Sequence, residues 1–352
     1  MRLDRPLNSA SSLPMSSHDF LHVHARTELS EDYVVGGFVF RLTTNHSALL
    51  DSVRSTWPRT KSVARPAFSW KFWVDDDDAS GPPWPQPCVR GLMDRVYAGF
   101  AAKSSVLADL RGRLIIGRFS PAMAADIVHW KTIVLPVLMS IMAGSIGMVE
   151  LHASCVARDG RGIILLGPSR SGKSTLAMAL LHSGLQLLSD DRIFCSLHNR
   201  NIIAYGLPRP LKLRSEASRW FKDVGKVDSV LAPNGEQVFY CQAGPGESST
   251  QSRTCQPIAL IFLNQQDTGF RMIRTQPSET RLGIEADLLA ETPDAAANQQ
   301  PVLDYLTSLP CWQLLYNGSP QWIARQILEH VFERVDRSNF ERRQEREHSD
   351  NQ

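Results

Sequence analysis

Residues 167–175 read GPSRSGKST and carry glycine, lysine and hydroxyl side chains at the spacing G-x-x-x-x-G-K-[ST]. Gly167 and Gly172 permit backbone torsions that turn successive N–H groups toward an anion. Lys173 adds a mobile positive charge, and Ser174 offers a hydroxyl to Mg²⁺. A helix that starts here would direct its N-terminal dipole at a phosphate. The predicted nucleotide-binding residues are Gly167, Pro168, Ser169, Arg170, Ser171, Gly172, Lys173, Ser174 and Thr175.

Two adjacent carboxylates, Asp190 and Asp191, follow an apolar stretch and lie 16 residues beyond Ser174. One of them would hold Mg²⁺ near the Ser174 hydroxyl, and the other could accept a proton from an attacking hydroxyl. The alternative for Asp190 is a strand-end residue without a chemical role. An alcohol is a weak nucleophile at neutral pH, so a positioned carboxylate predicts phosphate transfer to an alcohol acceptor.

The loop requires a strand before it and a helix after it, and the sequence indicates both. Residues 163–166 form a short apolar run, and a helical pattern follows Lys173 and ends near Gly184. Residues 151–166 indicate a hairpin that leads into the loop. Further strands are predicted over 185–189, 192–197, 202–207 and 258–263, and helices near 283–290 and 320–335.

The residues before 120 carry no catalytic signature. A strand is predicted over 33–43, a helix over 46–57, and a strand from 68 that ends in four aspartates at 75–78. Ser120 and Pro121 predict the start of a helix over 121–143. The predicted organisation is a flexible lead over 1–27, a small α/β domain over 28–125, a P-loop domain over 126–335 and a charged tail over 336–352.

Composition excludes several classes of protein. The chain has 352 residues, a net charge of +2 and 43% hydrophobic residues, which is an ordinary globular composition, and the charge balance implies neither a nucleic-acid partner nor an acidic tail. Its six cysteines show no C-x-x-C spacing, which argues against zinc and redox motifs and fits a reducing cytoplasm. The longest apolar stretch, 132–149, contains proline and glycine, and we interpret it as a buried core helix rather than a membrane span.

Residues 150–195 resemble the HPr kinase/phosphorylase family and its shorter relatives. The resemblance rests on His152, on the loop, on Gly184 and on the pair Asp190–Asp191, and it extends weakly to GLPRPLKL at 206–213. It implies an α/β P-loop domain of the HPr-kinase/phosphoenolpyruvate-carboxykinase type that uses ATP and Mg²⁺. Arg170 stands where that family has glycine, and the family's second signature is absent after residue 195.

The resemblance also implies roles for individual residues. Asp190 would be the catalytic base with His152 hydrogen-bonded to it, Lys173 would serve the γ-phosphate, and Asp191 would join Ser174 at the metal. The implied activity is that of an ATP-dependent serine kinase acting on a peptide or small protein. Lasso-peptide precursors are one such substrate, and HPr itself is the alternative. The oligomeric state stays open, with a homo-oligomer as one option.

Two other functions stay open. Asn264 and Asp267 follow a predicted strand near the N-K-x-D spacing that reads guanine, which would suit a GTPase-like switch. A nucleotide-sensing binding module is the other. Arg209 and Lys212, in PRPLKL, are candidate clamps for the transferred phosphate, against the alternative of a solvated strand edge.

Overall fold

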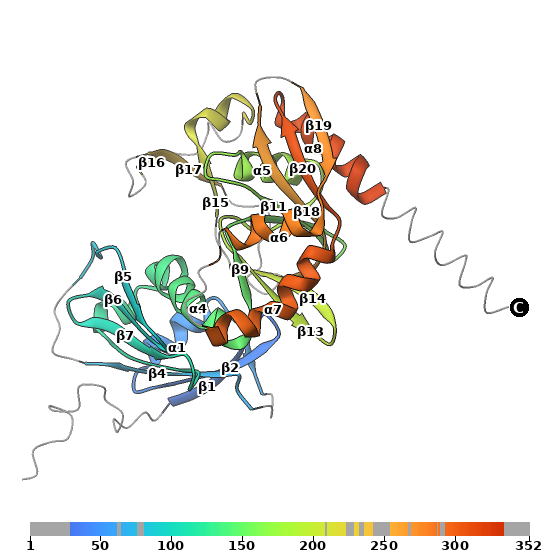
Figure 1. Ribbon diagram of the computed structural model, residues 1–352. Coiled ribbons are helices and arrows are strands. Elements are labelled where there is room, and N and C mark those ends of the chain that lie inside the picture. The colour runs from blue at the N-terminus through green and yellow to red at the C-terminus, as the bar shows by residue number, and fades with distance from the viewer. Residues whose placement is uncertain are drawn as a thin grey trace, which may run out of the picture. The chain divides into compact units, whose positions relative to one another are not determined.

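The computed structural model (Figure 1) describes residues 29–61, 65–75, 81–207, 210–222, 229–231, 236–241, 254–266, 269–286, 288 and 293–333. These residues form two compact units. The first comprises residues up to Val34 together with Phe38–Val137, and the second comprises Val35–Gly37 and the chain from Leu138 onward. The division along the chain therefore falls at 137/138, whereas the sequence placed it at 125/126.

The first unit contains an eight-stranded sheet in the order β3-β1-β2-β4-β8-β7-β6-β5. Strands β2, β4 and β8 run parallel, and β5 to β8 form an antiparallel meander. The strands are β1 (Leu29–Val35), β2 (Phe38–Thr44), β3 (Arg59–Thr60), β4 (Phe68–Val74), β5 (Cys88–Leu92), β6 (Arg95–Ala101), β7 (Ser104–Asp109) and β8 (Leu114–Phe119).

The core of this unit is aromatic because alternate residues of β4 point to the same face of the sheet. Phe68, Trp70 and Phe72 are almost completely buried. Phe40 of β2 lies opposite Phe68 in the parallel register, and their ring centroids are 5.0 Å apart. Aromatic side chains of this size account for much of the apolar surface that the unit buries.

The strand predicted over 33–43 is interrupted by a turn. Gly36 and Gly37 have φ angles of +55° and +86°, which side chains with a Cβ rarely adopt. The chain therefore reverses between β1 and β2, which are neighbours in the sheet. Strand β4 ends at Val74, and most of the aspartate run lies outside the described residues.

Helix α1 (Ser47–Arg54) covers part of the predicted helix 46–57, and the helix predicted over 121–143 is confirmed in four segments. The Ser120 hydroxyl accepts a hydrogen bond from the Met123 N–H at 3.3 Å, which caps the first segment. The segments are α2 (Pro121–Ala125), α3 (Ile127–His129), a π-helical stretch (Trp130–Val134) and α4 (Leu135–Ala143).

One helical stretch of the described chain, Ile127–Ile146, is long and apolar enough to cross a membrane by length and composition. Half of its most apolar window is buried inside the protein. Core helices of soluble proteins have the same properties, so this stretch is weak support for a membrane span.

The second unit contains a nine-stranded sheet with the path β12-β10-β11-β18-β14-β13-β9, and β20 and β19 extend from β18. Strands β11, β18 and β20 run parallel. The strands are β9 (Val149–Leu151), β10 (Ser154–Arg158), β11 (Arg161–Leu166), β12 (Gln186–Ser189), β13 (Ile193–His198), β14 (Asn201–Gly206), β18 (Thr254–Gln265), β19 (Phe270–Arg274) and β20 (Cys311–Tyr316).

Both faces of this sheet are buried, which is why β11 reads as a continuous apolar run. Ile163 and Leu165 pack in the same cluster as residues of α5 and α8, whereas Ile164 and Leu166 pack with residues of α7. The helices are α5 (Lys173–His182), α6 (Pro277–Glu285), α7 (Pro293–Ser308) and α8 (Pro320–Leu328). The sequence did not predict α7, whose interior contains Pro301.

A separate three-stranded sheet completes the unit, in the order β15-β17-β16. Its strands are β15 (Leu211–Arg214), β16 (Val230–Leu231) and β17 (Gln237–Cys241). Leu211 and Leu213 are buried in the same cluster as residues of α5, so the small sheet packs on the face of the large sheet that α5 covers.

Two short connections link opposite edges of the large sheet. Strand β9 is the edge strand on one side, and the chain continues from it through residues 152–153 into β10, which lies near the opposite edge. In the same way, β12 continues through residues 190–192 into β13. Connections this short span at most about 10–14 Å. The sheet must therefore curl until its two ends meet, and His152, Asp190 and Asp191 lie at that junction.

Candidate active site

The glycine-rich loop joins β11 to α5, as the sequence predicted. Gly167, Arg170 and Gly172 have φ angles of +142°, +72° and +89°. A Cβ on Gly167 would lie 2.9 Å from the Leu263 carbonyl oxygen, so only glycine fits there. Helix α5 begins at Lys173, and its N-cap residue, Gly172, has no side chain with which to cap the first N–H groups.

The underside of the loop rests on the ends of the two neighbouring parallel strands. Tyr316, at the end of β20, donates a hydrogen bond from its Oη to the Ser171 carbonyl at 2.6 Å. The Gln265 amide, at the end of β18, lies 3.5 Å from the same Oη. A Cβ on Gly172 would meet Tyr316 Oη at 2.3 Å. Burial raises the pKa of Tyr316 to about 12, so the phenol stays protonated and able to donate.

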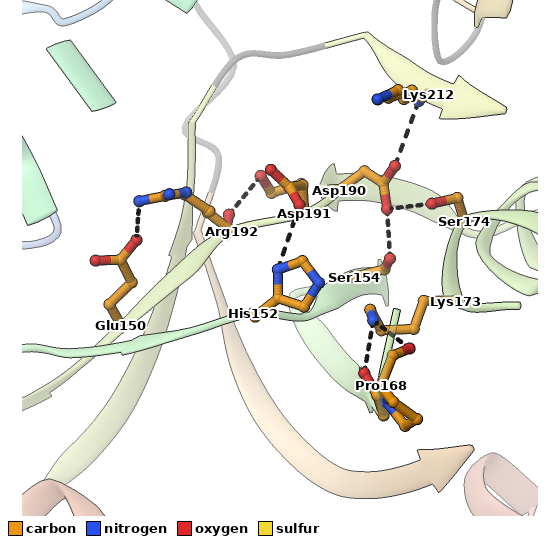
Figure 2. Close-up of polar contacts among 12 residues, drawn as sticks. Glu150, His152, Ser154, Pro168, Lys173, Ser174, Asp190, Asp191, Arg192 and Lys212 are labelled. Carbon is orange, nitrogen blue, oxygen red and sulfur yellow. Dashed lines mark hydrogen bonds and ion pairs between the residues drawn. The ribbon is translucent and has the colours of Figure 1, made fainter. Parts of the chain in front are cut away.

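Lys173 is buried and turns its ammonium toward the loop. Its Nζ donates to the carbonyls of Gly167 at 2.6 Å and Pro168 at 3.1 Å (Figure 2). The Ser171 hydroxyl is also buried, and its Oγ has no hydrogen-bond partner among the described residues. A buried donor without a partner costs free energy, so an acceptor at this loop would stabilise it.

Asp190 accepts three hydrogen bonds (Figure 2). Its Oδ1 accepts from Ser154 Oγ at 2.5 Å and from Ser174 Oγ at 3.0 Å, and its Oδ2 accepts from the Lys212 backbone N–H at 3.3 Å. The residue is only 3% exposed. Burial raises the pKa of Asp190, and the three hydrogen bonds oppose that rise by stabilising the carboxylate. Asp190 is therefore the carboxylate that faces the loop.

Asp191 points in the other direction, toward His152 (Figure 2). His152 Nδ1 lies 3.3 Å from Asp191 Oδ1, and the two side chains are 44% and 50% exposed. Asp191 has a φ of +75°, an uncommon conformation for a residue other than glycine. Because of this backbone torsion, the carboxylates of Asp190 and Asp191 contact different partners, Ser174 and His152.

The pairing of these groups corrects the prediction. The resemblance implied that His152 bonds to Asp190 and that Asp191 serves the metal with Ser174. In the structure His152 pairs with Asp191 instead, and the Ser174 hydroxyl bonds to Asp190. The reason is the left-handed turn at Asp191, which a residue count along the chain does not reveal.

Strand register explains why these particular side chains meet. Leu151 pairs with Ile193, and Cys155 pairs with Ser189, so the segments run antiparallel past the junction. In that register Ser154 falls directly opposite Asp190, where cross-strand side chains are close enough to bond.

A second polar network, formed by Arg192, Glu150 and Ser140, lies beside the junction. Arg192 Nη1 donates to Glu150 Oε1 at 2.6 Å and to Ser140 Oγ at 2.7 Å. Ser140 Oγ also donates to Glu150 Oε1 at 3.0 Å. Glu150 lies in β9 just before His152, and Arg192 follows Asp191, so this network fastens the His152 segment to the Asp191 turn (Figure 2).

The remaining predicted residues have various positions. Pro168 and Ser169 are exposed on the loop, and Thr175 lies half-buried in the first turn of α5. Lys212 meets the site through its backbone N–H, and Arg209 lies outside the described residues. Of the residues considered for guanine recognition, Asn264 is exposed at the end of β18 and Asp267 lies outside the described residues.

Four residues at this site were not predicted. Ser154 bonds to Asp190, Tyr316 and Gln265 support the loop, and Glu236 forms an ion pair with Arg170 at 2.9 Å. Ser154 lies two residues beyond His152, in the segment that carries the family resemblance. The other three come from segments distant in the sequence, and no local pattern identifies them.

Comparison with known proteins adds little to this geometry. No protein-family model matches the chain, and no curated protein matches it significantly. Among solved structures, the chain is similar to the HPr(Ser) kinase/phosphatase from Coxiella burnetii. The identity is 16%, the match covers 56% of this chain and 96% of that chain, and the TM-score is 0.28. A likeness at that level carries no argument about family or activity.

Proposed function

We propose that this protein is an Mg²⁺-dependent kinase that transfers the γ-phosphate of ATP to a serine hydroxyl of a peptide or small protein. The observation that carries the proposal is one continuous group of contacts. The Ser174 hydroxyl beside Lys173 bonds to buried Asp190, and the next residue, Asp191, pairs with solvent-facing His152. In the proposed function these neighbouring groups serve as a phosphate loop, a metal-side carboxylate and a base.

The residues present fit a nucleotide and a magnesium ion. The N–H groups at the start of α5, the Lys173 ammonium and the Ser171 hydroxyl are all donors, and the Ser171 hydroxyl has no hydrogen-bond partner among the described residues, which suits an anion. Ser174 and Asp190 offer the hard oxygen ligands that Mg²⁺ prefers. Bound Mg²⁺ would supply charge neutralisation for the β- and γ-phosphates.

The chain's own groups divide the remaining work. Lys173 leaves the loop carbonyls to neutralise the γ-phosphate. The Asp191–His152 pair takes the proton of the acceptor hydroxyl as its oxygen bonds to the γ-phosphorus. The bond between that phosphorus and the β–γ bridging oxygen breaks, and ADP leaves. Asp190, held by Ser154 and the Lys212 N–H, keeps the Ser174 hydroxyl aligned throughout.

The proposed class of acceptor rests on the exposure of the Asp191–His152 pair and on the sequence resemblance of residues 150–195 to HPr-kinase-like proteins. The base pair is about half exposed, so an acceptor hydroxyl can approach it from solvent as part of a larger molecule. The resemblance to HPr-kinase-like proteins supports serine as that hydroxyl. A ribosomally made precursor peptide of the lasso type is the first candidate acceptor, and HPr is the second.

The test compares two neighbouring carboxylates. Asp191→Asn should bind Mg·ATP as the wild type does, yet transfer phosphate about 10²- to 10⁴-fold more slowly, because it loses the base. Asp190→Asn should weaken Mg²⁺-dependent ATP binding, and Lys173→Ala should weaken ATP binding with or without Mg²⁺. Calorimetry measures binding, and mass spectrometry of candidate peptides incubated with ATP measures transfer.

The competing functions give different results in the same assays. A GTPase-like switch would bind GTP in preference to ATP in a thermal-shift comparison. A nucleotide-sensing module would bind ATP and transfer nothing to any peptide. Transfer by Asp191→Asn at the wild-type rate would remove Asp191 as the base.

A further inference from the structure

Arg170 is an unusual residue for the middle of the phosphate loop. Its φ of +72° lies in the left-handed region, which glycine adopts without cost and a long side chain does not. The side chain is 71% exposed, so packing does not compensate for that conformation. Strained backbone that persists in a ligand loop calls for a role of the side chain.

The guanidinium of Arg170 is held by one carboxylate. Arg170 Nη2 lies 2.9 Å from Glu236 Oε1, and Arg214 Nη2 lies 3.2 Å from the same oxygen. Two guanidinium groups thus share this oxygen, so the cluster of Arg170, Arg214 and Glu236 carries a net positive charge. An ion pair this exposed is weak, and a more highly charged anion can compete for the arginine.

The anion that fits Arg170 is a phosphate. Arginine presents a planar set of N–H donors that matches two phosphate oxygens, and it stays charged at any physiological pH. Arg170 lies three residues before Lys173 on the same loop, so a phosphate bound by that loop would be within reach of its long side chain. An arginine that reaches the transferred group in phosphoryl transfer stabilises the charge that develops there.

Glu236 immediately precedes β17 of the small sheet. The same sheet reaches the carboxylate side of the site, where the Lys212 N–H bonds to Asp190 at 3.3 Å. The small sheet therefore contacts the loop at Arg170 and the metal-side carboxylate at Asp190. A contact that restrains the loop arginine links the small sheet to nucleotide binding.

We propose that Arg170 binds the γ-phosphate of the nucleotide and that Glu236 is a latch that holds Arg170 away from it. This inference rests on the proposed function, because it names a further residue of the same loop. Glu236 competes with the γ-phosphate for one guanidinium, so the Arg170–Glu236 pair is autoinhibitory. ADP, which lacks the γ-phosphate, does not open the latch.

The test is the affinity for Mg·ATP and Mg·ADP, measured by calorimetry on the full chain. Arg170→Gly removes the guanidinium and suits the left-handed backbone. It should weaken Mg·ATP binding about tenfold and change Mg·ADP binding by less than about twofold. Glu236→Gln frees Arg170 and should tighten Mg·ATP binding about three- to tenfold. The double variant should lose that gain.

Arg200→Gly is the matched control, since Arg200 is also an exposed arginine with a positive φ, +66°, in the turn between β13 and β14. If Arg170→Gly weakens Mg·ATP no more than Arg200→Gly does, Arg170 does not bind the γ-phosphate. If Glu236→Gln tightens Mg·ATP equally with Arg170→Gly present, the latch is refuted. If Arg170→Gly does not fold, Arg170→Lys replaces it and should lose part of the ATP preference; an unchanged preference overturns the proposal. Wild-type protein that binds no Mg·ATP would refute the proposed function itself, which separates the two failures.

Discussion

The contact between Tyr316 and the glycine-rich loop can be tested by a double-mutant cycle that requires no substrate. Tyr316→Phe removes the hydroxyl that donates to the Ser171 carbonyl at 2.6 Å. A buried acceptor that loses its donor costs about 1–3 kcal/mol, so the variant should lose that much unfolding free energy. Gly172→Ala, in contrast, adds a methyl group 2.3 Å from the same hydroxyl.

The cost of Gly172→Ala has two parts. Alanine in the left-handed conformation costs about 1–2 kcal/mol, and overpacking against Tyr316 adds about 1–3 kcal/mol. With Phe at 316 the nearest ring atom, Cζ, would be 3.6 Å from the new methyl group, which is ordinary contact, and the remaining close atom, Gln265 Nε2 at 3.0 Å, is the end of a flexible side chain that can shift. Gly172→Ala should therefore cost about 2–5 kcal/mol in the wild type and only about 1–2 kcal/mol beside Tyr316→Phe.

The assay is urea unfolding combined with amide hydrogen exchange in β11 and α5, because a chain of two units need not unfold in one step. Gly160→Ala is the matched control. Gly160 has a φ of +74° with nothing within 4 Å of its Cβ position, so it measures the backbone cost alone. If Gly172→Ala costs the same with Tyr and with Phe at position 316, the hydroxyl does not lie against Gly172.

Three further predictions concern other contacts. Ser154→Ala removes a 2.5 Å hydrogen bond to Asp190 and should weaken Mg²⁺-dependent ATP binding about tenfold, with ATP binding in EDTA as the control that should not change. Gly206→Ala would place a Cβ 2.1 Å from the Leu188 carbonyl oxygen and should cost at least about 3 kcal/mol of unfolding free energy, whereas Gly81→Ala, in open space, should cost less than about 0.5. Arg54 lowers the pKa of Glu31, so this pair's stabilisation is present at neutral pH and is lost as the pH falls through the folded-state pKa. Glu31→Gln should then cost about 1 kcal/mol at pH 7 and much less at pH 3, and an equal cost at both would show that the carboxylate charge contributes nothing.

The features that the sequence determined are local. The loop at 167–172, the strand before it, the helix after it and the hairpin at 151–166 each follow from residue types at short spacing, and the structure contains all of them. The Ser120 cap and the helix from Pro121 are local in the same sense. Turn torsions were harder to predict, as the reversal at Gly36 and Gly37 shows. Helix α7 was missed because its periodicity is weak and its interior contains Pro301.

The contacts of the two carboxylates were decided by tertiary structure. Asp190 and Asp191 are adjacent in the chain, so residue spacing alone assigns them no order of contact. The positive φ of Asp191 and the register that sets Ser154 opposite Asp190 send one carboxylate to Ser174 and the other to His152. Tyr316 and Glu236 reach the loop across 145 and 66 residues of sequence. Such contacts depend on the order of the strands and on the curvature of the sheet. Both are set by the burial of the two apolar faces of the sheet over the whole unit, and no short segment of sequence encodes them.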